Sequence, residues 1–386
     1  MVNIILWDQA IHDQLLPITY LQPLGQIRLG RWRFADKWRI MTGGKVSHKS
    51  SYLLSDRFPC NVEDKNVIIP AYVLPSFELS ECVMELEVGQ YLEYQGRLIA
   101  VKLNSNETSK LLSGGEWKSF QRVEFTGKVQ FLENPEDFLQ HSESQILLDY
   151  RLSDDLTSEV KGEHVRVIGD QLKVGEGVTA VDCTLNTMSG PIILGKGSVI
   201  MEGCQLRGPL VLGEGSVVKM GASIYGATSV GRECKVGGEI KNSIFGDFSN
   251  KGHEGYIGDS VIGEWCNLGA GTSCSNMKNT YGEVKIWSII SEERRGTARQ
   301  FCGMFMGDHT KTAINTSFST GSVTGIFCNI LEPRPPSFVP SFSWGPGSRY
   351  DLDKLLEVTR RSYERKEVQM GDDEEQLIRS LHMQHT

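Results

Sequence analysis

Aliphatic residues return at every sixth position through the middle of the chain. The series comprises Leu194, Ile200, Leu206, Leu212, Val218, Ile224, Val230 and Val236. Four residues after each of them stands a second, mostly small residue, and glycine often follows the aliphatic position. A period of six matches neither the 3.6-residue repeat of an α-helix nor the two-residue alternation of a strand. It is typical of a parallel β-helix built from hexapeptide repeats, in which three short strands form a triangular coil of about 18 residues.

The repeat extends in both directions and is interrupted at three places. It begins with Ile168, Val174 and Ala180, and its phase slips by two residues before Leu194 and again after Val236. It continues through Ile244, Asn250, Tyr256, Ile262, Leu268 and Cys274, and ends with Met306, Thr312, Phe318, Thr324 and Ile330. The third interruption lies near residues 277–303. We expect loops to leave the prism at these places, and loops on a rigid scaffold often carry function.

Residues 1–150 lack the repeat and mix strand and helix patterns, so we expect an α/β domain there. Apolar runs at 3–6, 67–70 and 98–101 predict strands, and residues 31–40 predict a helix. The β-helix is expected over 151–332, after short helices near 135–139 and 145–152. Residues 333–386 are expected to form a proline-rich connector at 333–346 that leaves the prism, an amphipathic helix at 351–366 and an acidic end that frays.

Composition narrows the classes of partner. The 386 residues carry a net charge of −8, which argues against nucleic acid as the main partner. No run of 18 apolar residues predicts a membrane span, and the first residues read as a strand, not a signal peptide. The nine cysteines form no CxxC pair, and several of them take the small position of the repeat. Buried free thiols are therefore favoured over a disulfide or zinc framework, as expected of a cytoplasmic protein.

Polar residues gather where the phase slips after Val236. Glu239 and Lys241 come first, then the run KGHEGYIGD at 251–259, then NLGAGTSCSN at 267–276. One coil of 18 residues separates Tyr256 from position 274, so Asn276 should lie about one coil beyond Tyr256. Glu239 and Lys241 should lie about one coil on its other side. An isolated histidine such as His253 in a β-helix turn is often surface decoration, whereas this cluster in matching phase favours catalysis.

These two runs resemble the acetyltransferase half of the bifunctional N-acetylglucosamine-1-phosphate uridylyltransferase / glucosamine-1-phosphate acetyltransferase family. The chain as a whole looks like a short-headed variant, with a weaker resemblance at 16–20, 28–30 and 37–38. The resemblance implies a truncated nucleotidyltransferase-like α/β domain, a left-handed parallel β-helix of hexapeptide repeats and a C-terminal helix. It also implies acetyl-CoA as the acyl donor and an amino-sugar phosphate as the acceptor.

The same resemblance implies roles for individual residues. His253 would be the general base, a task that suits imidazole because its pKa lies near neutrality. Lys241 would hold the sugar phosphate. The residues Glu239, Tyr256 and Asn267 would orient the sugar, Asn276 would sit near the amine and thioester, and Ala270 would line the acetyl-CoA channel. Asp308 and Ile326 take positions where the family has smaller residues beside coenzyme A, so we expect them at the coenzyme.

The N-terminal domain departs from the nucleotidyltransferase pattern. Those enzymes follow the first strand with a glycine-rich loop and an arginine that hold a triphosphate. Here the stretch is WDQAIHD at 7–13, with neither. Asp8 could still bind a metal, and Arg28 or Lys37 a phosphate; Mg²⁺ and UTP are expected only if this domain is active. A degenerate or structural domain is favoured.

We therefore expect an acetyl-CoA-dependent N-acetyltransferase of the path to UDP-N-acetylglucosamine, assembled as a homotrimer. A trimer is the simplest closed ring that pairs each prism face with another copy. One alternative is a sugar-phosphate nucleotidyltransferase with a structural β-helix. The other is a non-catalytic scaffold that kept the fold.

Overall fold

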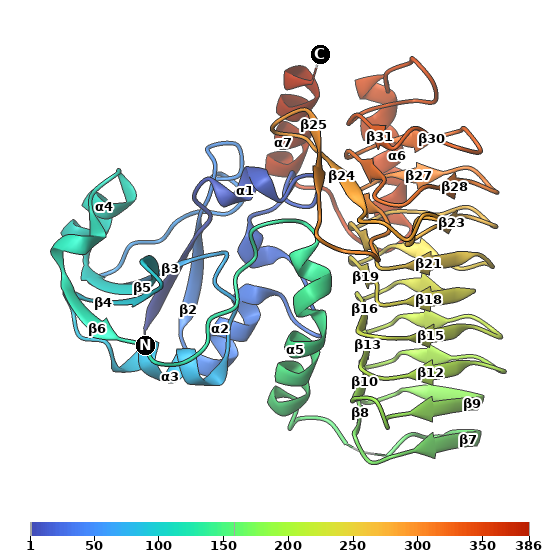
Figure 1. The fold of residues 1–386 in the computed structure, drawn as a ribbon, viewed down its shortest axis with the longest axis horizontal. Helices are drawn as coiled ribbons and strands as arrows, with labels where there is room; N and C mark the ends of the chain where they lie inside the picture. The colour runs from blue at the N-terminus through green and yellow to red at the C-terminus, as the bar shows by residue number, and fades with distance from the viewer. Residues whose placement is uncertain (1, 158, 386) are drawn as a thin grey trace. The chain divides into compact units, whose positions relative to one another are not determined.

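The computed structural model describes residues 2–157 and 159–385. The chain forms two compact units (Figure 1). The first comprises Met1–Leu15, Leu21–Ile27 and Trp32–Asp137, and the second comprises Leu16–Tyr20, Arg28–Arg31 and Phe138–Thr386. Each unit has its own hydrophobic core and is described by itself. No helix in the described part of the chain is long and apolar enough to span a membrane.

A mixed sheet of six strands organises the first unit, in the order β2-β1-β3-β5-β4-β6. The strands are β1 Asn3–Trp7, β2 Lys45–Lys49, β3 Lys65–Pro70, β4 Gln90–Tyr94, β5 Arg97–Asn104 and β6 Gln121–Glu124. Strand β1 runs parallel to β2 and β3, whereas β5 is antiparallel to β3 and β4. The three predicted strands are therefore confirmed as β1, β3 and β5.

Four helices accompany this sheet. They are α1 Ile11–Gln14, α2 Phe34–Thr42, α3 Phe77–Glu85 and α4 Ser105–Leu112, with 3-10 turns η1 Leu24–Gln26 and η2 Trp117–Ser119. Helix α2 begins three residues later than predicted and buries Phe34 and Trp38, which stand one turn apart on one face. It ends at Gly43, which takes a left-handed conformation with φ of 63°.

The second unit is a parallel β-helix with three faces. Face 1 is a nine-stranded sheet of β8 Leu172–Val174, β10 Ile192–Leu194, β13 Leu210–Leu212, β16 Thr228–Val230, β19 Ile244–Phe245, β22 Val261–Ile262, β26 Phe305–Met306, β29 Val323–Thr324 and β31 Phe338–Val339. Face 2 contains β11 Val199–Ile200, β14 Val217–Val218, β17 Lys235–Val236, β20 Asn250–Lys251, β27 Lys311–Thr312 and β30 Asn329–Ile330. Face 3 contains β12 Gln205–Arg207, β15 Ser223–Tyr225, β18 Glu239–Lys241, β21 Tyr256–Gly258, β23 Ser273–Cys274 and β28 Ser317–Phe318. The long strand β9 Thr179–Asn186 turns from face 2 to face 3 and pairs with β7 Gly162–Ile168.

The six-residue period places the core. All eight aliphatic residues of the central series are at most 1% exposed and belong to one cluster that fills the prism. Strand partners such as Leu194, Leu212 and Val230 lie in register across successive coils. The nine cysteines are free thiols, and seven of them are buried. The predicted β-helix and its buried thiols are confirmed. The phase predicted after Val236 was one residue early, because Phe245, Lys251 and Ile257 take the interior positions there in place of Ile244, Asn250 and Tyr256.

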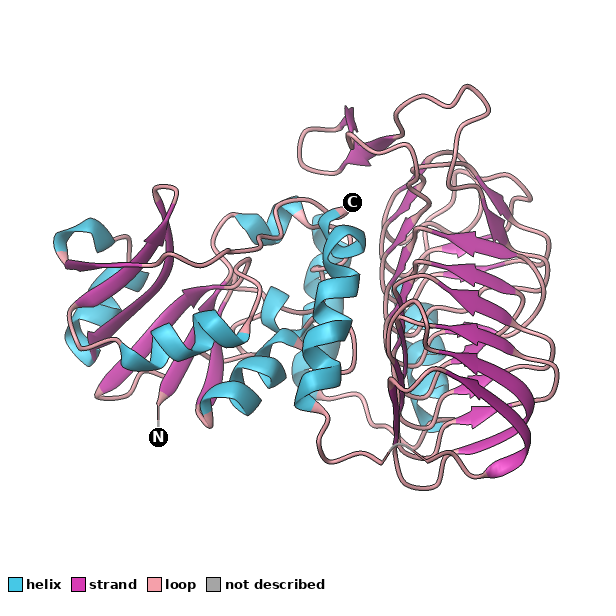
Figure 2. Ribbon diagram, turned by 60° about the horizontal axis from the view of Figure 1, so that its bottom comes forward, coloured by secondary structure: helices cyan, strands magenta, loops and turns pink. Residues whose placement is uncertain are grey.

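The interruptions of the repeat have structural counterparts. After Val236 the corner contains only Gly237 and Gly238 before β18, so Val236 pairs with Lys251 and not with a residue 18 positions later. The interruption at 277–303 leaves the prism as a hairpin of β24 Lys285–Ser288 and β25 Glu293–Gly296 (Figure 2). The residues predicted to be catalytic or to bind substrate therefore lie at shortened corners and beside the segment 277–303 that leaves the prism.

Two helices and the proline-rich segment differ from the prediction. The two short helices expected before the prism are one helix, α5 Asp137–Leu152, whose Ile146 packs on Ile193 and Val211 of face 1. The proline-rich segment does not leave the prism, because β31 pairs with β29 and extends face 1. The expected helix is confirmed as α6 Leu352–Glu364, whereas the acidic end expected to fray forms a helix, α7 Asp372–Gln384. Buried Leu377, Ile378 and Leu381 explain its order.

Candidate active site

Polar side chains form a column on face 3. Glu239 pairs with Tyr256 on the next coil, and Lys241 pairs with Gly258. Tyr225, one coil earlier, donates a 2.6 Å hydrogen bond from its hydroxyl to Glu239 Oε1. That bond to a carboxylate raises the pKa of Tyr225 to about 12. The predicted placement of Glu239 and Lys241 beside Tyr256 is thus confirmed.

Asp259 lies at the corner between faces 3 and 1 and accepts hydrogen bonds from two neighbouring side chains. Its side chain is 4% exposed and its backbone is left-handed, with φ of 46°. Asn276 donates from Nδ2 to Asp259 Oδ2 at 2.6 Å, and Asn242 donates to Oδ1 at 2.7 Å. Asn276 also donates to the hydroxyl oxygen of Tyr256 at 2.9 Å. Asn276 therefore lies one coil beyond Tyr256, as predicted.

The environment of Tyr256 keeps its hydroxyl protonated. Burial, followed by the negative charge of Asp259, raises the pKa of Tyr256 to about 12. Because its oxygen accepts from Asn276, its own O–H proton remains available to a ligand. The tyrosine can therefore act as a neutral hydrogen-bond donor across the physiological pH range.

Lys241 reaches the same cluster from strand β18. Its ammonium lies 5.1 Å from the centre of the Phe301 ring, which belongs to the excursion at 277–303. Within residues 2–157 and 159–385, no ion pair joins Lys241 to a carboxylate. A cation in that position can accept a phosphate without first breaking a salt bridge.

His253 stands exposed at the corner between faces 2 and 3. Beneath it, Lys251 takes an interior position of the coil and is fully buried. Its ammonium donates to the backbone carbonyls of His253 at 2.5 Å and Glu254 at 2.7 Å. Burial lowers the pKa of Lys251 to about 8. This internal lysine holds the turn that presents His253.

Ala270 lies at the same corner as His253, one coil later, and Asn267 lies on face 2 just before that turn. Ala270 is half-buried in the corresponding turn one coil later, where its carbonyl accepts from Asn315 N at 2.7 Å. Asn267 belongs to face 2, bridging to Asn250 and Lys311. Asn267 and Tyr256 are therefore on different faces of one chain, and a single copy does not bring them together.

Asp308 and Ile326 lie at the corner between faces 1 and 2. Asp308 is 2% exposed and accepts from Glu264 N at 2.7 Å, and Ile326 is completely buried. The position puts them away from the Tyr256 cluster. The coenzyme contact expected of these two residues stays a prediction.

Asp8, in the first unit, is buried and accepts two hydrogen bonds. Leu24 N donates to its Oδ1 at 3.2 Å and Ser50 Oγ donates to its Oδ2 at 2.6 Å, and burial raises its pKa to about 6. Among the described residues, no group of three or more His, Cys, Asp or Glu could hold a metal. Because Mg²⁺ is often held by one or two carboxylates together with water and substrate phosphates, a metal at Asp8 stays a prediction.

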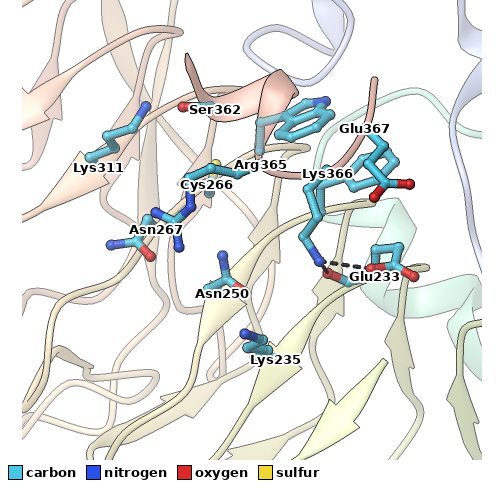
Figure 3. Close-up of a pocket in the computed structure, with 12 residues that line it drawn as sticks. Glu233, Lys235, Asn250, Cys266, Asn267, Lys311, Ser362, Arg365, Lys366 and Glu367 are labelled. Atoms are coloured by element: carbon cyan, nitrogen blue, oxygen red, sulfur yellow. Dashed lines mark hydrogen bonds and ion pairs between the residues drawn. The ribbon is translucent and has the colours of Figure 1, made fainter. Parts of the chain in front are cut away.

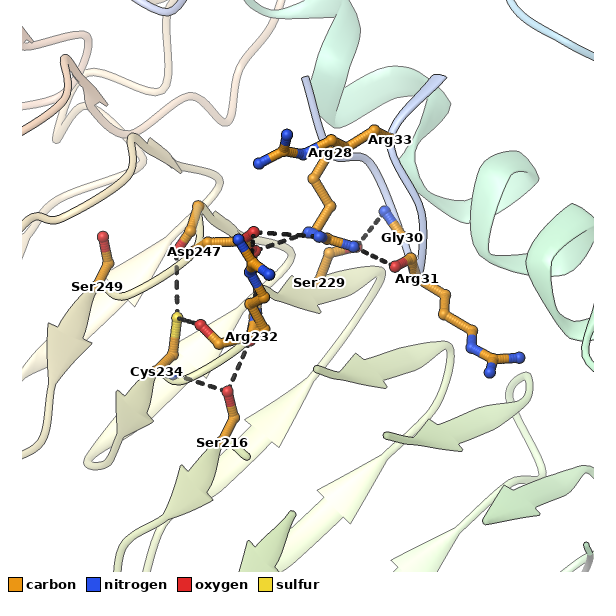
Figure 4. A network of polar contacts seen from close by, with 12 residues as sticks. Arg28, Gly30, Arg31, Arg33, Ser216, Ser229, Arg232, Cys234, Asp247 and Ser249 are labelled. Carbon is orange, nitrogen blue, oxygen red and sulfur yellow. Dashed lines mark hydrogen bonds and ion pairs between the residues drawn. The ribbon is translucent and has the colours of Figure 1, made fainter. Parts of the chain in front are cut away.

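Arg28 and Lys37 do not form the phosphate site expected of them. Arg28, which is part of the second unit, forms a two-pronged ion pair with the buried Asp247, at 2.7 Å and 3.1 Å (Figure 4). Asp247 also binds Arg232 at 3.0 Å. Lys37 is completely buried in α2. These cations therefore serve the folded structure.

Sequence reasoning missed the residues that organise the cluster. Asn242 and Tyr225 belong to no motif, and Asp259 and Lys251 stand in the KGHEGYIGD run without a predicted role. Asn242 and Asp259 each have positive φ and replace longer turns at the corner between faces 3 and 1. The shortened spacing at this corner could have identified Asn242 and Asp259, because asparagine and aspartate adopt positive φ more readily than most other residues.

Comparison with known proteins agrees with this two-part organisation. Residues 4–156 match the sugar nucleotidyl transferase family. A bifunctional sugar-1-phosphate nucleotidylyltransferase/acetyltransferase of Sulfurisphaera tokodaii is 36% identical over 92 residues, which is 24% of this chain and 22% of that protein. The bifunctional protein GlmU of Wigglesworthia glossinidia brevipalpis is 30% identical over 161 residues, 41% of this chain and 30% of that protein.

These alignments span about a fifth to a third of each relative. Among solved structures, Arabidopsis UDP-N-acetylglucosamine acyltransferase is 17% identical and covers 54% of this chain and 79% of that one, with a TM-score of 0.20. A TM-score this low carries no argument, and the fold is established by the coils of this chain. The chain joins a sugar nucleotidyltransferase domain to a parallel β-helix and is a distant homologue of the bifunctional enzymes.

Proposed function

We propose that the β-helix catalyses transfer of an acetyl group from acetyl-CoA to the amine of an amino-sugar phosphate such as glucosamine 1-phosphate. The observation that carries the proposal is the ordered Tyr256–Asn276–Asp259 network on face 3. It is flanked by the exposed His253 and by Lys241, which forms no ion pair with any described residue. The homology to bifunctional nucleotidyltransferase/acetyltransferases supports the reaction class.

His253 acts as the general base in this scheme. It takes a proton from the sugar amine, whose lone pair attacks the thioester carbonyl carbon. The tetrahedral intermediate then collapses, the carbon–sulfur bond breaks, and the departing thiolate receives the proton from the imidazolium. The products are an amide and free coenzyme A. An exposed corner suits this task because substrate and solvent can both reach the imidazole.

The face 3 column orients the acceptor. Lys241 binds the phosphate, the Tyr256 hydroxyl donates to the sugar, and Glu239 accepts from a sugar hydroxyl. Asn276 is held on two acceptors and therefore keeps a fixed position close to the reacting amine. Preorganised groups of this kind avoid the entropy cost of ordering during the reaction.

Assembly completes the site in this proposal. Asn267 on face 2 and Tyr256 on face 3 meet only if face 2 of one copy approaches face 3 of another. A homotrimer pairs every face 2 with a face 3, giving three sites. Sedimentation equilibrium should give about three times 43.0 kDa. A fully active monomer would refute the shared site.

Sugar-1-phosphate nucleotidyl transfer from UTP is the second candidate, because residues 4–156 match that family. The loop after β1 counts against it, since neither glycine nor arginine is present between Asp8 and Asp13. A non-catalytic scaffold is the third possibility and predicts neither reaction.

Mass spectrometry separates the three. The full chain is incubated with glucosamine 1-phosphate and acetyl-CoA, and then with UTP and Mg²⁺. Growth of the N-acetylated sugar phosphate supports the proposal, and a nucleotide sugar formed after UTP adds the second activity. Nucleotide sugar without acetylation would favour the second candidate, and no product at all would favour a scaffold.

A further inference from the structure

A cavity of about 600 Å³ lies on face 2, beside the C-terminal end of α6 (Figure 3). Its volume falls in the range of small-molecule sites. The residues that line it come from β17, β20 and β27 on face 2, from the coil segments that precede or join these strands, and from the end of α6 and the turn that follows it. Every one of them belongs to the second unit. Of the lining residues, Asn267 was predicted to orient the sugar.

The lining carries an excess of positive charge. Among the described residues, four cations line the cavity, Lys235, Lys311, Arg365 and Lys366, against the two carboxylates of Glu233 and Glu367. Lys366 is neutralised by Glu233 Oε2 at 2.8 Å. Within the described part of the chain, no ion pair engages Lys235, Lys311 or Arg365.

Lys311 is partly buried at this cavity. Its ammonium has one weak contact, to the carbonyl of His309 at 3.3 Å. Burial lowers its pKa, and no carboxylate of the described residues forms an ion pair with it. A desolvated cation without a counter-ion destabilises the folded chain unless an anion binds to it.

The face 2 strands space these groups regularly. Lys235 pairs with Asn250, Asn250 bridges to Asn267, and Asn267 bridges to Lys311. The column therefore reads Lys, Asn, Asn, Lys over three coil steps, roughly 14 Å at the usual strand spacing. Asn250 Oδ1 is buried and has no hydrogen-bond partner among the described residues. Two cations separated by two amides match an elongated anion better than a single small ion.

Part of this charge has another explanation. Arg365 and Lys366 follow the last turn of α6, where cations stabilise the negative end of the helix dipole. That argument does not apply to Lys235 and Lys311, which stand on strands. The strand lysines are therefore the residues that point to a ligand.

We propose that this cavity binds a phosphate-bearing metabolite through Lys235, Lys311 and Arg365, with Asn250 and Asn267 bonding to its uncharged part. The charge of three cations in one cavity favours a ligand with more than one phosphate group, such as a diphosphate. A coenzyme A molecule and a nucleotide sugar both carry that group. The binding proposal does not require acetyl transfer, although it shares Asn267 with the substrate residues proposed above.

Isothermal titration calorimetry of the full chain tests this site, with inorganic pyrophosphate as the probe. We expect saturable binding that weakens as salt is added. Lys235→Gln and Lys311→Gln should each weaken it about tenfold or more, as loss of a charge-assisted bond does. Lys196→Gln is the matched control, because Lys196 is an exposed lysine on the same prism and does not line the cavity.

Parallel titrations with coenzyme A and with UDP-N-acetylglucosamine identify the source of the diphosphate. The ligand whose affinity falls in Lys235→Gln and Lys311→Gln but not in Lys196→Gln is the natural occupant class. No pyrophosphate binding, or equal binding by all four proteins, would overturn the proposal. Binding is measured here without turnover. A negative acetyl-transfer assay would therefore not change the conclusion about this cavity.

Discussion

Two corners of one prism show how the same coil supports opposite chemistry. At the corner between faces 1 and 2, aromatic rings stack from coil to coil and the C-terminal helices contact them. At the corner between faces 2 and 3, the turn at 252–255 is small and polar, and His253 in that turn is exposed. The strands entering both corners repeat in the same register. The difference therefore lies in the corner residues and in what packs on them.

The aromatic corner is continuous. Phe248 stacks on Trp265 at 4.1 Å between ring centroids, and His309 stacks on Phe327 at 4.4 Å. Tyr363 of α6 stacks on Trp265 at 4.3 Å, and its hydroxyl donates to the buried Glu374 of α7 at 2.7 Å. Stacked rings add packing energy beyond the area they bury. This corner anchors the C-terminal helices.

The polar corner has no such cover in the described chain. Its support comes from inside, through the buried Lys251 that holds two carbonyls of the turn. An internal support leaves the outer surface open to substrates. The comparison predicts that changes at the polar corner affect turnover, and that changes at the aromatic corner affect stability.

His253→Ala should have the largest effect. Loss of a general base lowers turnover by about 10²- to 10⁴-fold. The side chain is exposed, so its removal leaves no core cavity and the melting temperature should stay within a degree or two of wild type. Steady-state acetyl transfer and calorimetry check both halves. Turnover within threefold of wild type would sink the assignment.

Phe342→Ala should give the reverse pattern. Phe342 is completely buried, stacks near Phe327 and meets the rings of His382 and His385 edge-on. Truncation should lower the free energy of unfolding by about 3–5 kcal/mol. Turnover per folded molecule should be unchanged. Denaturant titration and an active-site-normalised rate provide the test, and a selective loss of turnover would break the division between the corners.

Lys251→Met should change how the stability of the protein depends on pH. The folded pKa of Lys251 is about 8, against 10.5 for the ordinary side chain. Between these values the unfolded chain binds more protons than the folded chain, so stability from this group rises with pH. Relative to the methionine variant, wild type should gain roughly 2–3 kcal/mol between pH 8 and pH 10.5. Parallel pH profiles would contradict a buried, titrating lysine.

Lys241→Ala should produce the smallest of these effects. A phosphate clamp contributes to ground and transition states alike, so the KM for the sugar phosphate should rise about tenfold or more while kcat changes little. The KM for acetyl-CoA should be unaffected. Lys219→Ala, a lysine on the same prism outside the cluster, is the control. An equal rise in both KM values would argue against the phosphate role.

The interior of the prism was the most predictable part of the molecule. A six-residue period fixes which side chains point inward, and every aliphatic residue from Leu194 to Val236 in that series is buried. Coil spacing also placed Glu239, Tyr256 and Asn276 near one another. Local pattern suffices there because each coil repeats the geometry of the last.

Contacts between distant segments were not predictable in the same way. Arg28 binds Asp247 across 219 positions, and Arg365 reaches the face 2 cavity from beyond α6. No periodicity encodes such pairs. The proline-rich segment was misjudged for a related reason: its prolines suggested a connector, whereas pairing of β31 with β29 extends the sheet. Tertiary pairing overrode the local composition.

Chemical rescue of His253→Ala tests the central claim most directly. Because the corner is open to solvent, added imidazole can occupy the space of the lost side chain and accept the proton. We expect acetyl transfer to glucosamine 1-phosphate to rise with the concentration of neutral imidazole, in the variant and not in wild type. A variant that acetylates at the wild-type rate before any imidazole is added would contradict the account.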